Sequence, residues 1–544
     1  MRRFASVFLL AALALTAFAS AGGATQADRQ AYLVVFKDDA AINGIETDTL
    51  TYAVAAQHAA TLVQQAGGTI TSNMVDEIGV VAVESPNALF DETLRASGLV
   101  YSAGEEFVWK ALPTAAELAV QGPLDDPFCH PILDPDNPAC PPSSLPEEAF
   151  EDLQWDMQQI CAVESDDARW TSLCGSGAHA LPNGSGRPQV DVGVLDTGID
   201  GKPVTGHVDL RANVDCPRGR DSIGETQTVP LDPGVALPDP CIDNGFHGTH
   251  VAGTIAADDN GTGMVGIAPN VRLIPVKVCD SVGYCYFNAV VDGIYYAGHQ
   301  KFDVINMSFF VDDDQFLQSH EFKCSSDPIQ RTIRHAVERA IQYARNQGVT
   351  PVAALGNSDE DLAHPSEFEN ECDVVPAETQ GVIGTMALGR DSQKASYSNY
   401  GNGMTDVAAP GGAGNTGDCL TTILSTFPGN TYFCIQGTSM ASPHSAGVAA
   451  VIVSAYGQDT VDTNDPNTPL DDTAPPVDVR MPPQQVEAYL QSTTIDLTNS
   501  GAGLDTLNGY DECFGNGRID ARRAVLHETA TIREVVPVCT DGQD

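Results

Sequence analysis

Basic residues are scarce in this sequence. Its 544 residues include 27 lysines and arginines against 73 aspartates and glutamates, so the formal net charge is −46 at pH 7. Nucleic-acid binding depends on basic side chains that neutralise phosphates, and a surface with this excess of negative charge repels them. The composition therefore excludes nucleic acid as a partner and favours a heavily hydrated protein.

Long apolar runs are missing after the first residues of the chain. Residues 1–21, MRRFASVFLLAALALTAFASA, have a basic start, an apolar stretch and the small-x-small end Ala19-Ser20-Ala21. That order is typical of a secretory signal peptide. No later window is apolar for long enough to span a bilayer. We therefore expect an exported protein, extracellular or periplasmic, without a membrane span.

Cysteine is absent from the N-terminal part, because all 14 cysteines lie between Cys129 and Cys539. An even number in an exported chain favours disulfides, and no Cys-x-x-Cys pair supports zinc as the alternative. The spacing does not determine the connectivity. Sequence neighbours that could form local staples are Cys216 with Cys241, Cys279 with Cys285, and Cys419 with Cys434.

A proline- and acid-rich stretch, residues 113–150, divides the chain and is interpreted as a linker. Before it, residues 22–112 alternate short apolar strands with a helix-like stretch, which predicts a small α+β domain. Over residues 151–528, strand-like runs such as VDVGVLD alternate with helical ones, which predicts an α/β fold: a parallel sheet with helices on both faces. A second Pro/Asp-rich segment, residues 457–483, predicts a surface insertion, and residues 529–544 form a C-terminal tail.

The tripeptide Asp196-Thr197-Gly198 ends an apolar run and permits two hypotheses. Pepsin-like aspartic proteases present a catalytic carboxylate in this way, but their acid dyad needs two such carboxylates. Here Asp-Thr-Gly occurs once and Asp-Ser-Gly never, and the α/β alternation contradicts an all-β acid protease. The favoured hypothesis is that Asp196 orients a histidine that deprotonates a serine.

Two further motifs supply that histidine and that serine. FHGTHVAGTIAA places His247 at the expected start of one helix, and GTSMASPHSAG places Ser439 at the start of another. A nucleophile at a helix N-terminus faces exposed backbone N–H groups and the positive end of the helix dipole. In the order Asp, His, Ser, the blocks VLDTGID, HGTHVAGT and GTSMASPHSAG resemble the signature blocks of the subtilisin-like serine proteases, or subtilases.

The resemblance implies a serine endopeptidase that hydrolyses peptide bonds of proteins through an acyl-enzyme. Asp196 would hold the imidazole, His247 would act as general base and then general acid, and Ser439 would attack the scissile carbonyl. Asn357 in PVAALGNS matches the oxyanion-hole asparagine of the family. Two further histidines match family scaffold positions without a chemical role: His250 and His444.

Substrate peptides in this family pair as an extra strand along the site, and DVINMSFF resembles one wall of it. The match holds through Ser308, after which the family usually continues with a Leu-Gly-Gly type sequence. Bulk in place of glycine leaves the depth of the main specificity pocket open. The expected substrate-binding residues are Ser308, Phe309, Phe310, Gly356 and Gly437.

A calcium loop is a further implication, because residues 256–269, AADDNGTGMVGIAP, have the length and Gly/Asn pattern of the family's loop. Its oxygens suit a hard cation. An acidic surface turn is the alternative, and the connection before Asp209 is longer than in common subtilisins. The implied ligands are the carbonyls of Asp258, Thr262 and Met264 with the side chains of Asn260 and Asp209.

The start of the N-terminal domain, YLVVFKDD, resembles the family's propeptide, which chaperones and inhibits its own enzyme. The resemblance therefore implies a monomeric zymogen whose partners are protein or peptide substrates and its own propeptide, with a mature chain that begins between residues 111 and 150. A catalytically silent, protein-binding subtilase scaffold is the alternative. A trypsin- or esterase-like hydrolase is opposed by the order of the blocks and by the absence of a Gly-x-Ser-x-Gly motif.

Overall fold

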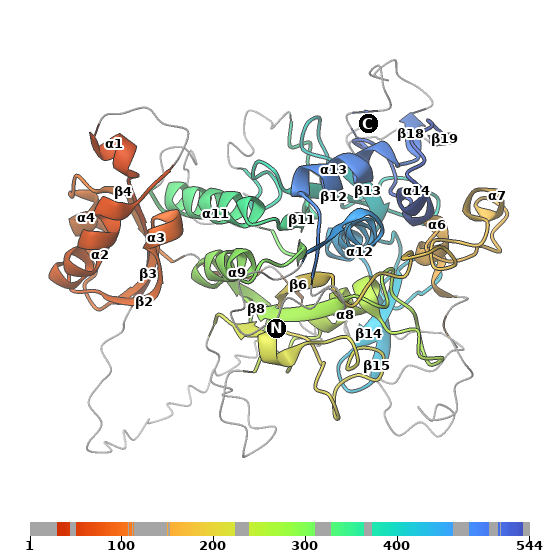
Figure 1. The fold of residues 1–544 in the computed structure, drawn as a ribbon, viewed down its shortest axis with the longest axis horizontal. Helices are drawn as coiled ribbons and strands as arrows, with labels where there is room; N and C mark the ends of the chain where they lie inside the picture. Colours follow the sequence, from red (N-terminus) through yellow and green to blue (C-terminus); the bar gives the residue numbers. More distant parts are fainter. Residues whose placement is uncertain are drawn as a thin grey trace, which may run out of the picture.

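The computed structural model describes most of the chain as two units in contact with each other (Figure 1). The expected signal peptide, most of the expected linker, and the end of the C-terminal tail lie outside the described residues. The described residues are 30–43, 50–106, 108–110, 112–113, 150, 153–223, 239–310, 328–363, 373–460, 478–499, 510–511 and 513–536.

Seven parallel strands form the central sheet of the larger unit, in the order β13-β12-β11-β10-β6-β8-β7. Strands such as β6 are buried along their whole length, as the apolar runs predict for a sheet that helices cover on both faces. The strands are β6 (Asp191–Asp196), β7 (Arg220–Asp221), β8 (Arg272–Lys277), β10 (Val304–Met307), β11 (Thr350–Ala354), β12 (Ile383–Leu388) and β13 (Val407–Pro410).

Helices cover both faces of this sheet, which confirms the predicted fold class. Val192 and Val194 of β6 belong to the core that includes α8 and α12, whereas Leu195 belongs to the core that includes α9 and α11. Among the described residues, no helix combines the length and apolarity needed to cross a membrane. The helices are α8 (His247–Ala256), α9 (Phe287–Gln300), α11 (Pro328–Asn346), α12 (Thr438–Tyr456), α13 (Pro483–Ser492) and α14 (Ala521–Leu526).

Short elements that the sequence analysis did not anticipate surround the sheet. The expected insertion at 457–483 begins and ends with two paired strands, β16 and β17, and residues 461–477 between them lie outside the described part. The short elements are α6 (Trp155–Gln159), α7 (Thr171–Cys174), η2 (Cys216–Arg218), β9 (Tyr284–Tyr286), β14 (Ile423–Phe427), β15 (Thr431–Ile435), β16 (Gln458–Thr460), β17 (Asp478–Arg480), β18 (Asp496–Asn499) and β19 (Arg533–Val536).

The N-terminal unit, red and orange in Figure 1, has the predicted α+β composition. Its sheet is antiparallel, in the order β2-β3-β1-β4. Its elements are β1 (Gln30–Phe36), α1 (Asp39–Asn43), α2 (Ala53–Gln65), β2 (Thr69–Met74), α3 (Val75–Ile78), β3 (Val80–Ser85), α4 (Phe90–Arg95) and β4 (Val100–Glu105), with β5 (Val108–Lys110) after them.

Both faces of this small sheet are covered, because it packs against the larger unit as well as against its own helices. Tyr32 and Val34 of β1 belong to the core with α2 and α4, whereas Leu33 and Val35 share a core with α9 and α11. Polar contacts join the same surfaces. Arg339 of α11 donates to the carbonyl oxygen of Phe36 at 2.7 Å.

Four disulfides lie within the described part of the chain. Three of them are the sequence neighbours named above, Cys216–Cys241, Cys279–Cys285 and Cys419–Cys434, so disulfides as local staples are confirmed for these pairs. The fourth, Cys161–Cys174, joins the segments after α6 and at the end of α7.

Candidate active site

Asp196 is the last residue of β6 and is fully buried. Its carbonyl oxygen accepts hydrogen bonds from the backbone N–H groups of Val278 and Cys279, at 2.9 and 3.2 Å. The N–H of Thr197 donates to its Oδ1 at 2.7 Å. The carboxylate is therefore fixed at the carboxyl end of a central strand, where α/β sheets commonly place functional groups.

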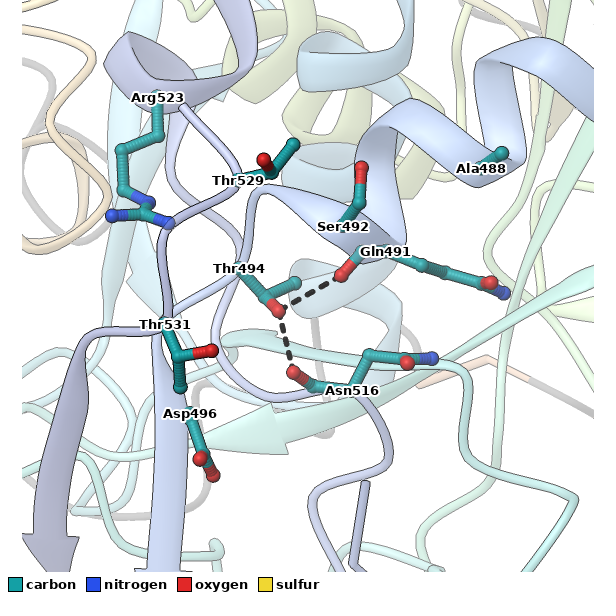
Figure 2. A pocket seen from close by; sticks show the side chains of 9 residues that line it. All are labelled: Ala488, Gln491, Ser492, Thr494, Asp496, Asn516, Arg523, Thr529 and Thr531. Atoms are coloured by element: carbon teal, nitrogen blue, oxygen red, sulfur yellow. Dashed lines mark hydrogen bonds between the residues drawn. The ribbon is translucent and has the colours of Figure 1, made fainter. Parts of the chain in front are cut away.

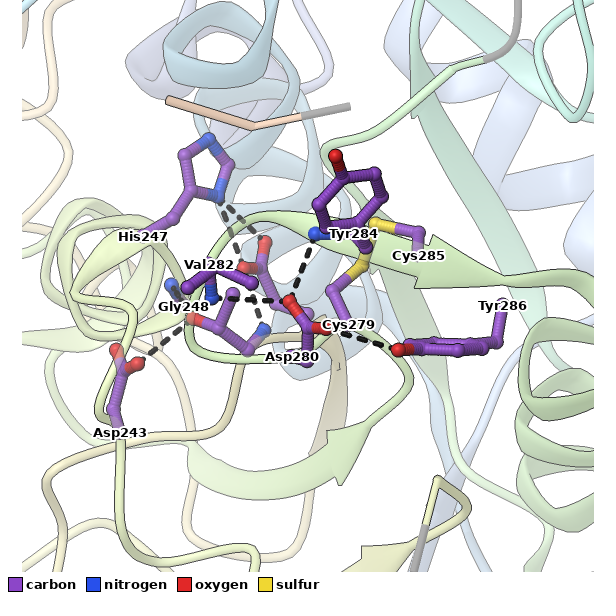
Figure 3. Close-up of a disulfide and its surroundings, with 11 residues drawn as sticks. Asp243, His247, Gly248, Cys279, Asp280, Val282, Tyr284, Cys285 and Tyr286 are labelled. Carbon is purple, nitrogen blue, oxygen red and sulfur yellow. Dashed lines mark hydrogen bonds and ion pairs between the residues drawn. A yellow bond between two sulfur atoms is a disulfide. The ribbon is translucent and has the colours of Figure 1, made fainter. Parts of the chain in front are cut away.

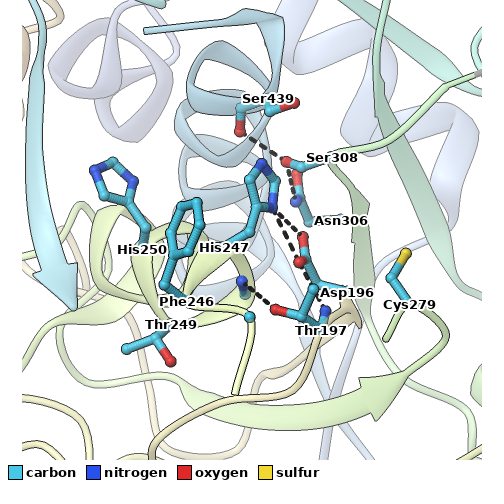
Figure 4. A network of polar contacts seen from close by, with 12 residues as sticks. Asp196, Thr197, Phe246, His247, Thr249, His250, Cys279, Asn306, Ser308 and Ser439 are labelled. Carbon is cyan, nitrogen blue, oxygen red and sulfur yellow. Dashed lines mark hydrogen bonds and ion pairs between the residues drawn. The ribbon is translucent and has the colours of Figure 1, made fainter. Parts of the chain in front are cut away.

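His247 is the first residue of α8, and its ring faces Asp196 (Figure 4). Its Nδ1 lies 3.0 Å from Oδ1 and 2.9 Å from Oδ2 of that carboxylate. Both side chains are buried, with exposed fractions of 3% for His247 and 0% for Asp196. A carboxylate on Nδ1 keeps the proton on that nitrogen, which leaves Nε2 as the basic atom.

Ser439 is the second residue of α12, and Figure 4 shows it on the side of the His247 ring away from Asp196. Two side chains from β10 and the residue after it hold the backbone of Ser439. Ser308 Oγ donates to the carbonyl oxygen of Ser439 at 2.8 Å, and Asn306 Nδ2 donates to Ser308 Oγ at 2.8 Å. Ser442 Oγ in turn donates to Asn306 Oδ1 at 2.7 Å. The geometry thus brings together the three residues expected to form the triad.

Asn357 follows β11 and is exposed, with its amide oriented by Thr438. Its Oδ1 accepts hydrogen bonds from the N–H and from the hydroxyl of Thr438, both at 2.9 Å. Because the oxygen end is occupied, the Nδ2 donor is left to face the other way. The sequence analysis did not single out Thr438. It stands directly before Ser439 in the sequence, and its contact with Asn357 is formed only in the folded chain.

Gly437 keeps open the space on which two donors converge. An ideal Cβ on this residue would lie 3.6 Å from the Ser439 backbone nitrogen and 3.7 Å from Asn357 Nδ2. A side chain at position 437 would therefore fill the volume that an oxyanion needs between these donors. The positive φ of Gly437, 154°, also favours glycine there.

Asp243 is a buried residue that the sequence analysis missed, and it ties the segment before α8 to β6. Its Oδ1 accepts from Thr197 Oγ1 and from the N–H groups of Gly245 and Phe246, each at 2.8 Å. Its Oδ2 accepts from the N–H and hydroxyl of Thr249. Burial raises the pKa of Asp243, which these hydrogen bonds oppose. The network fixes the backbone on both sides of His247.

The five residues expected to bind substrate are all buried. The hydroxyl of Ser308 supports the nucleophile, and Phe309 and Phe310 are buried. Phe310 lies against Gly356, where an added Cβ would be 3.4 Å from its ring and 2.4 Å from Asn399 Nδ2. Residues 311–327, which continue this wall, lie outside the described part.

The two histidines expected to be scaffold, His250 and His444, are fully buried. His250 Nε2 lies 3.2 Å from the carbonyl oxygens of Ile423 and Phe433, and burial lowers its pKa to about 3. His444 places Nδ1 against the carbonyl oxygen of Met440 at 2.8 Å and Nε2 against Asp156 at 2.9 Å. The partners of both rings are main-chain carbonyl oxygens and Asp156, with no contact to Ser439 among them.

The residues expected to hold calcium lie together, with Asp209 against the loop that follows α8. Asp258 N donates to the Asp209 carbonyl oxygen at 2.7 Å, and Asn260 Nδ2 donates to Asp209 Oδ1 at 3.1 Å. Met264 N and Tyr432 Oη donate to Oδ2, at 3.3 and 2.7 Å. The oxygens fit a hard cation in type. No cluster of three or more His, Cys, Asp or Glu is found among the described residues, so such a site would combine the Asp209 carboxylate with carbonyl and amide oxygens.

A hollow at the C-terminal side of the fold, between α13, β18 and α14, contains none of the triad residues (Figure 2). Its polar groups bond to the protein itself: Arg523 Nε donates to the Thr493 carbonyl oxygen at 3.0 Å, and Thr494 Oγ1 to that of Gln491 at 3.0 Å. The hollow is separate from the candidate active site. It is lined by Ala488, Gln491, Ser492, Thr494, Asp496, Asn516, Arg523, Thr529 and Thr531.

An aspartate at the carboxyl end of a parallel strand, with a histidine and a serine in the first turns of two helices beside it, is an arrangement typical of serine hydrolases. The chain belongs to the subtilase family, whose model matches residues 187–517. The match includes the central sheet and leaves out the N-terminal unit. The chain is thus a subtilisin-like serine protease, as the signature blocks predict.

Curated relatives agree with this assignment, and a solved structure shares the fold. The chain is 36% identical to subtilisin DY of Bacillus licheniformis over 267 residues, 49% of this chain and 77% of that protein. It is 34% identical to subtilisin E of Bacillus subtilis (strain 168) over 267 residues, 49% of this chain and 56% of that protein. The fold resembles that of the epidermin leader peptide processing serine protease of Staphylococcus aureus, with a TM-score of 0.59 at 19% identity, over 91% of this chain and 98% of that one.

Proposed function

We propose that the protein is a secreted serine endopeptidase that cleaves protein substrates with a triad of Asp196, His247 and Ser439. The observation that carries this proposal is the buried contact of His247 Nδ1 with the Asp196 carboxylate, at 2.9 Å, beside a serine in the first turn of α12. Its signal-like N-terminus and its disulfides support export.

In this mechanism Ser439 Oγ attacks the scissile carbonyl carbon while its proton moves to His247 Nε2. Asp196 stays ionised and stabilises the imidazolium. The oxyanion accepts hydrogen bonds from the Ser439 N–H and from Asn357 Nδ2, and collapse breaks the C–N bond as His247 gives the proton to the leaving amine. A water molecule then hydrolyses the acyl-enzyme along the same path, with His247 again as the base.

A serine-directed phosphonylating reagent tests this function. We expect stoichiometric labelling of Ser439 in the mature enzyme, with parallel loss of protein hydrolysis, because only a serine deprotonated by His247 reacts at a useful rate. The Ser439→Ala variant is the control and should take up no label. Failure of the mature protein to label would instead favour the catalytically silent, protein-binding scaffold.

The N-terminal unit is proposed to be a propeptide that inhibits the enzyme until it is removed. Its last strand, β5, pairs antiparallel with β9, which lies in the segment that follows the backbone contact with Asp196. Ser72 Oγ also donates to Asp292 of α9 at 2.7 Å. An extended segment beside the triad blocks the approach of a substrate, and this supports an inhibitory role.

Release of this unit is predicted to depend on pH through Glu106. Its Oε1 accepts from Asn288 N, at the start of α9, at 3.2 Å. Burial, and then the charge of Glu84, raise the pKa of Glu106 from 4.5 to about 7, against the effect of that hydrogen bond. A raised pKa in the complex means that the protonated form binds better. Affinity is therefore highest below the pKa of the free unit and falls as pH rises through about 7.

We expect precursor incubated at pH 8 to gain activity at least about tenfold faster than precursor incubated at pH 5, with every sample assayed at one fixed pH. Glu106→Gln keeps the neutral form at every pH, so it should remove most of this difference by slowing activation at pH 8. The neighbouring exposed Glu105→Gln is the matched control and should behave as the wild type. An unchanged pH response in Glu106→Gln would rule out Glu106 as the group responsible.

Calcium bound by Asp209 and the 258–264 loop is proposed as a structural cofactor. It would replace the hydrogen bonds that now join the loop to the Asp209 carboxylate. Adding a chelator to the mature enzyme should then lower the melting temperature by roughly 5 °C, since an ion at 100 times its Kd contributes about 2.7 kcal/mol. Asp209→Asn should melt lower and lose its response to the chelator. Identical melting of the wild type with and without chelator would contradict the proposal.

A further inference from the structure

A disulfide closes a small hairpin next to the candidate active site (Figure 3). Cys279 and Cys285 face each other across the hairpin as an antiparallel bridge and are both fully buried. Asp280 N donates to the Tyr284 carbonyl oxygen at 2.8 Å, and Tyr286 N to that of Val278 at 3.3 Å. The second arm of this hairpin is β9.

The side chain of Asp280 accepts hydrogen bonds from the turn of the same hairpin and from its second arm. Its Oδ1 accepts from the N–H groups of Val282 and Tyr284, at 3.0 and 2.9 Å, and its Oδ2 accepts from the hydroxyl of Tyr286 at 2.9 Å. Figure 3 shows Asp280 between Val282, on the side of His247, and Tyr286, on the side away from it. One buried carboxylate and one disulfide therefore fix the turn and both arms.

The first arm of the hairpin is hydrogen-bonded to the backbone of Asp196, the aspartate of the proposed triad. The N–H groups of Val278 and Cys279 both donate to the carbonyl oxygen of Asp196. These two contacts are made by backbone atoms, so they do not involve the sulfur atoms of the disulfide. The hairpin has a fixed base at the triad and an outer strand that extends away from it.

The outer strand already pairs with an extended piece of this chain. Val108 pairs with Tyr286 and Lys110 with Tyr284, and Leu112 N continues the pairing with the Gly283 carbonyl oxygen at 3.1 Å. Gly283 has a φ of 88°, and a Cβ there would lie 2.0 Å from the Leu112 carbonyl oxygen. The backbone of β9 is thus built for close approach by another backbone.

We propose that Cys279–Cys285 and Asp280 are positioning residues that hold β9 in the conformation that receives the backbone of an extended peptide substrate. This inference rests on the proposed peptidase function. A hairpin that is ordered before binding loses little conformational entropy when the peptide pairs with it. The peptide therefore binds more tightly than it would to a flexible hairpin. The effect concerns only substrates long enough to reach β9.

The test compares substrates of different length on the mature enzyme made from the full chain. p-Nitrophenyl acetate has no peptide backbone, whereas peptide p-nitroanilides can extend one to four residues on the acyl side. In the double variant C279A/C285A we expect kcat/KM for the four-residue substrate to fall about tenfold, mainly through KM. Hydrolysis of p-nitrophenyl acetate should stay within about twofold of the wild type.

Two further variants separate positioning from general stability. C161A/C174A removes a disulfide outside the hairpin and should retain the wild-type dependence on substrate length. Asp280→Asn keeps the disulfide but offers an amide nitrogen to one of the three donors, so it should show a smaller loss of the same kind, and it tests the inference even if C279A/C285A does not fold. Equal losses for the short and long substrates, or no loss for the long one, would overturn the inference. A wild type inactive even on p-nitrophenyl acetate would instead contradict the proposed function.

Discussion

Asp196→Asn is expected to lower kcat by about 10⁴-fold with little change in the melting temperature, which is the scale of this substitution in serine proteases that use a triad. The reason is visible in the hydrogen bonds of the carboxylate. Thr197 N donates to Oδ1 at 2.7 Å, so the oxygen of an asparagine will occupy that position. The amide nitrogen then takes the place of Oδ2 and points its hydrogens at His247 Nδ1.

A donor against Nδ1 reverses the tautomer of His247. The ring must accept on Nδ1 and carry its proton on Nε2, the atom that has to receive the proton of Ser439. Nε2 can then no longer accept the proton of Ser439, although the ring of His247 has not moved. A loss that is confined to kcat, with KM and melting temperature near the wild type, is the expected pattern.

Asp303→Asn is the matched control for this experiment. Asp303 is also buried at the central sheet. It directly precedes β10 and so lies at the amino ends of the strands, whereas Asp196 lies at their carboxyl ends. It accepts from Asp191 N at 2.8 Å and from Arg480 at 3.2 Å. Its substitution should lower stability and leave kcat within about twofold. If both variants lost kcat equally, the loss could not be attributed to the tautomer of His247.

The central sheet and the candidate triad residues could be picked out from the sequence because their signals are local. Runs such as VDVGVLD are continuous in the sequence and became a buried strand, and the motif around Ser439 became the start of α12. The family resemblance then supplied the grouping of Asp196, His247 and Ser439. Local patterns also anticipated three of the four disulfides within the described residues, because those cysteines are sequence neighbours.

Contacts between distant segments could not be predicted in this way. Thr438 orients Asn357 across a separation of 81 residues, and Asp243 bonds to Thr197 across 46. Neither residue is unusual in its own motif. The strand β9 was also missed, because a run of three residues is too short to show the alternating pattern of a strand. Such residues are recognised from their hydrogen-bond partners, which only the fold supplies.

Asn357→Ala is the second substitution with a large expected effect, a loss of about 10²–10³ in kcat with KM little changed. This range is the one measured when the oxyanion asparagine of a subtilisin is removed, and it is adopted here because the chain belongs to that family. Steady-state hydrolysis of one peptide p-nitroanilide by both proteins measures it. A loss in KM alone would contradict an oxyanion role and indicate a contact with the ground-state substrate.

Thr438 makes this prediction more specific, because it separates the presence of the amide from its orientation. Thr438→Val keeps the shape of the side chain but removes the hydroxyl that donates to Asn357 Oδ1 at 2.9 Å and accepts from Gly356 N at 3.2 Å. The amide then keeps only the hydrogen bond from Thr438 N, at 2.9 Å, and is held less firmly, so kcat should fall about tenfold while Asn357 is still present. Thr438→Ser restores the hydroxyl and should recover most of the activity.

A double variant tests whether Thr438 acts through Asn357. In the background of Asn357→Ala, Thr438→Val should lower kcat little further, because the two residues act on the oxyanion as one unit. Additive losses in the double variant would show that Thr438 acts elsewhere.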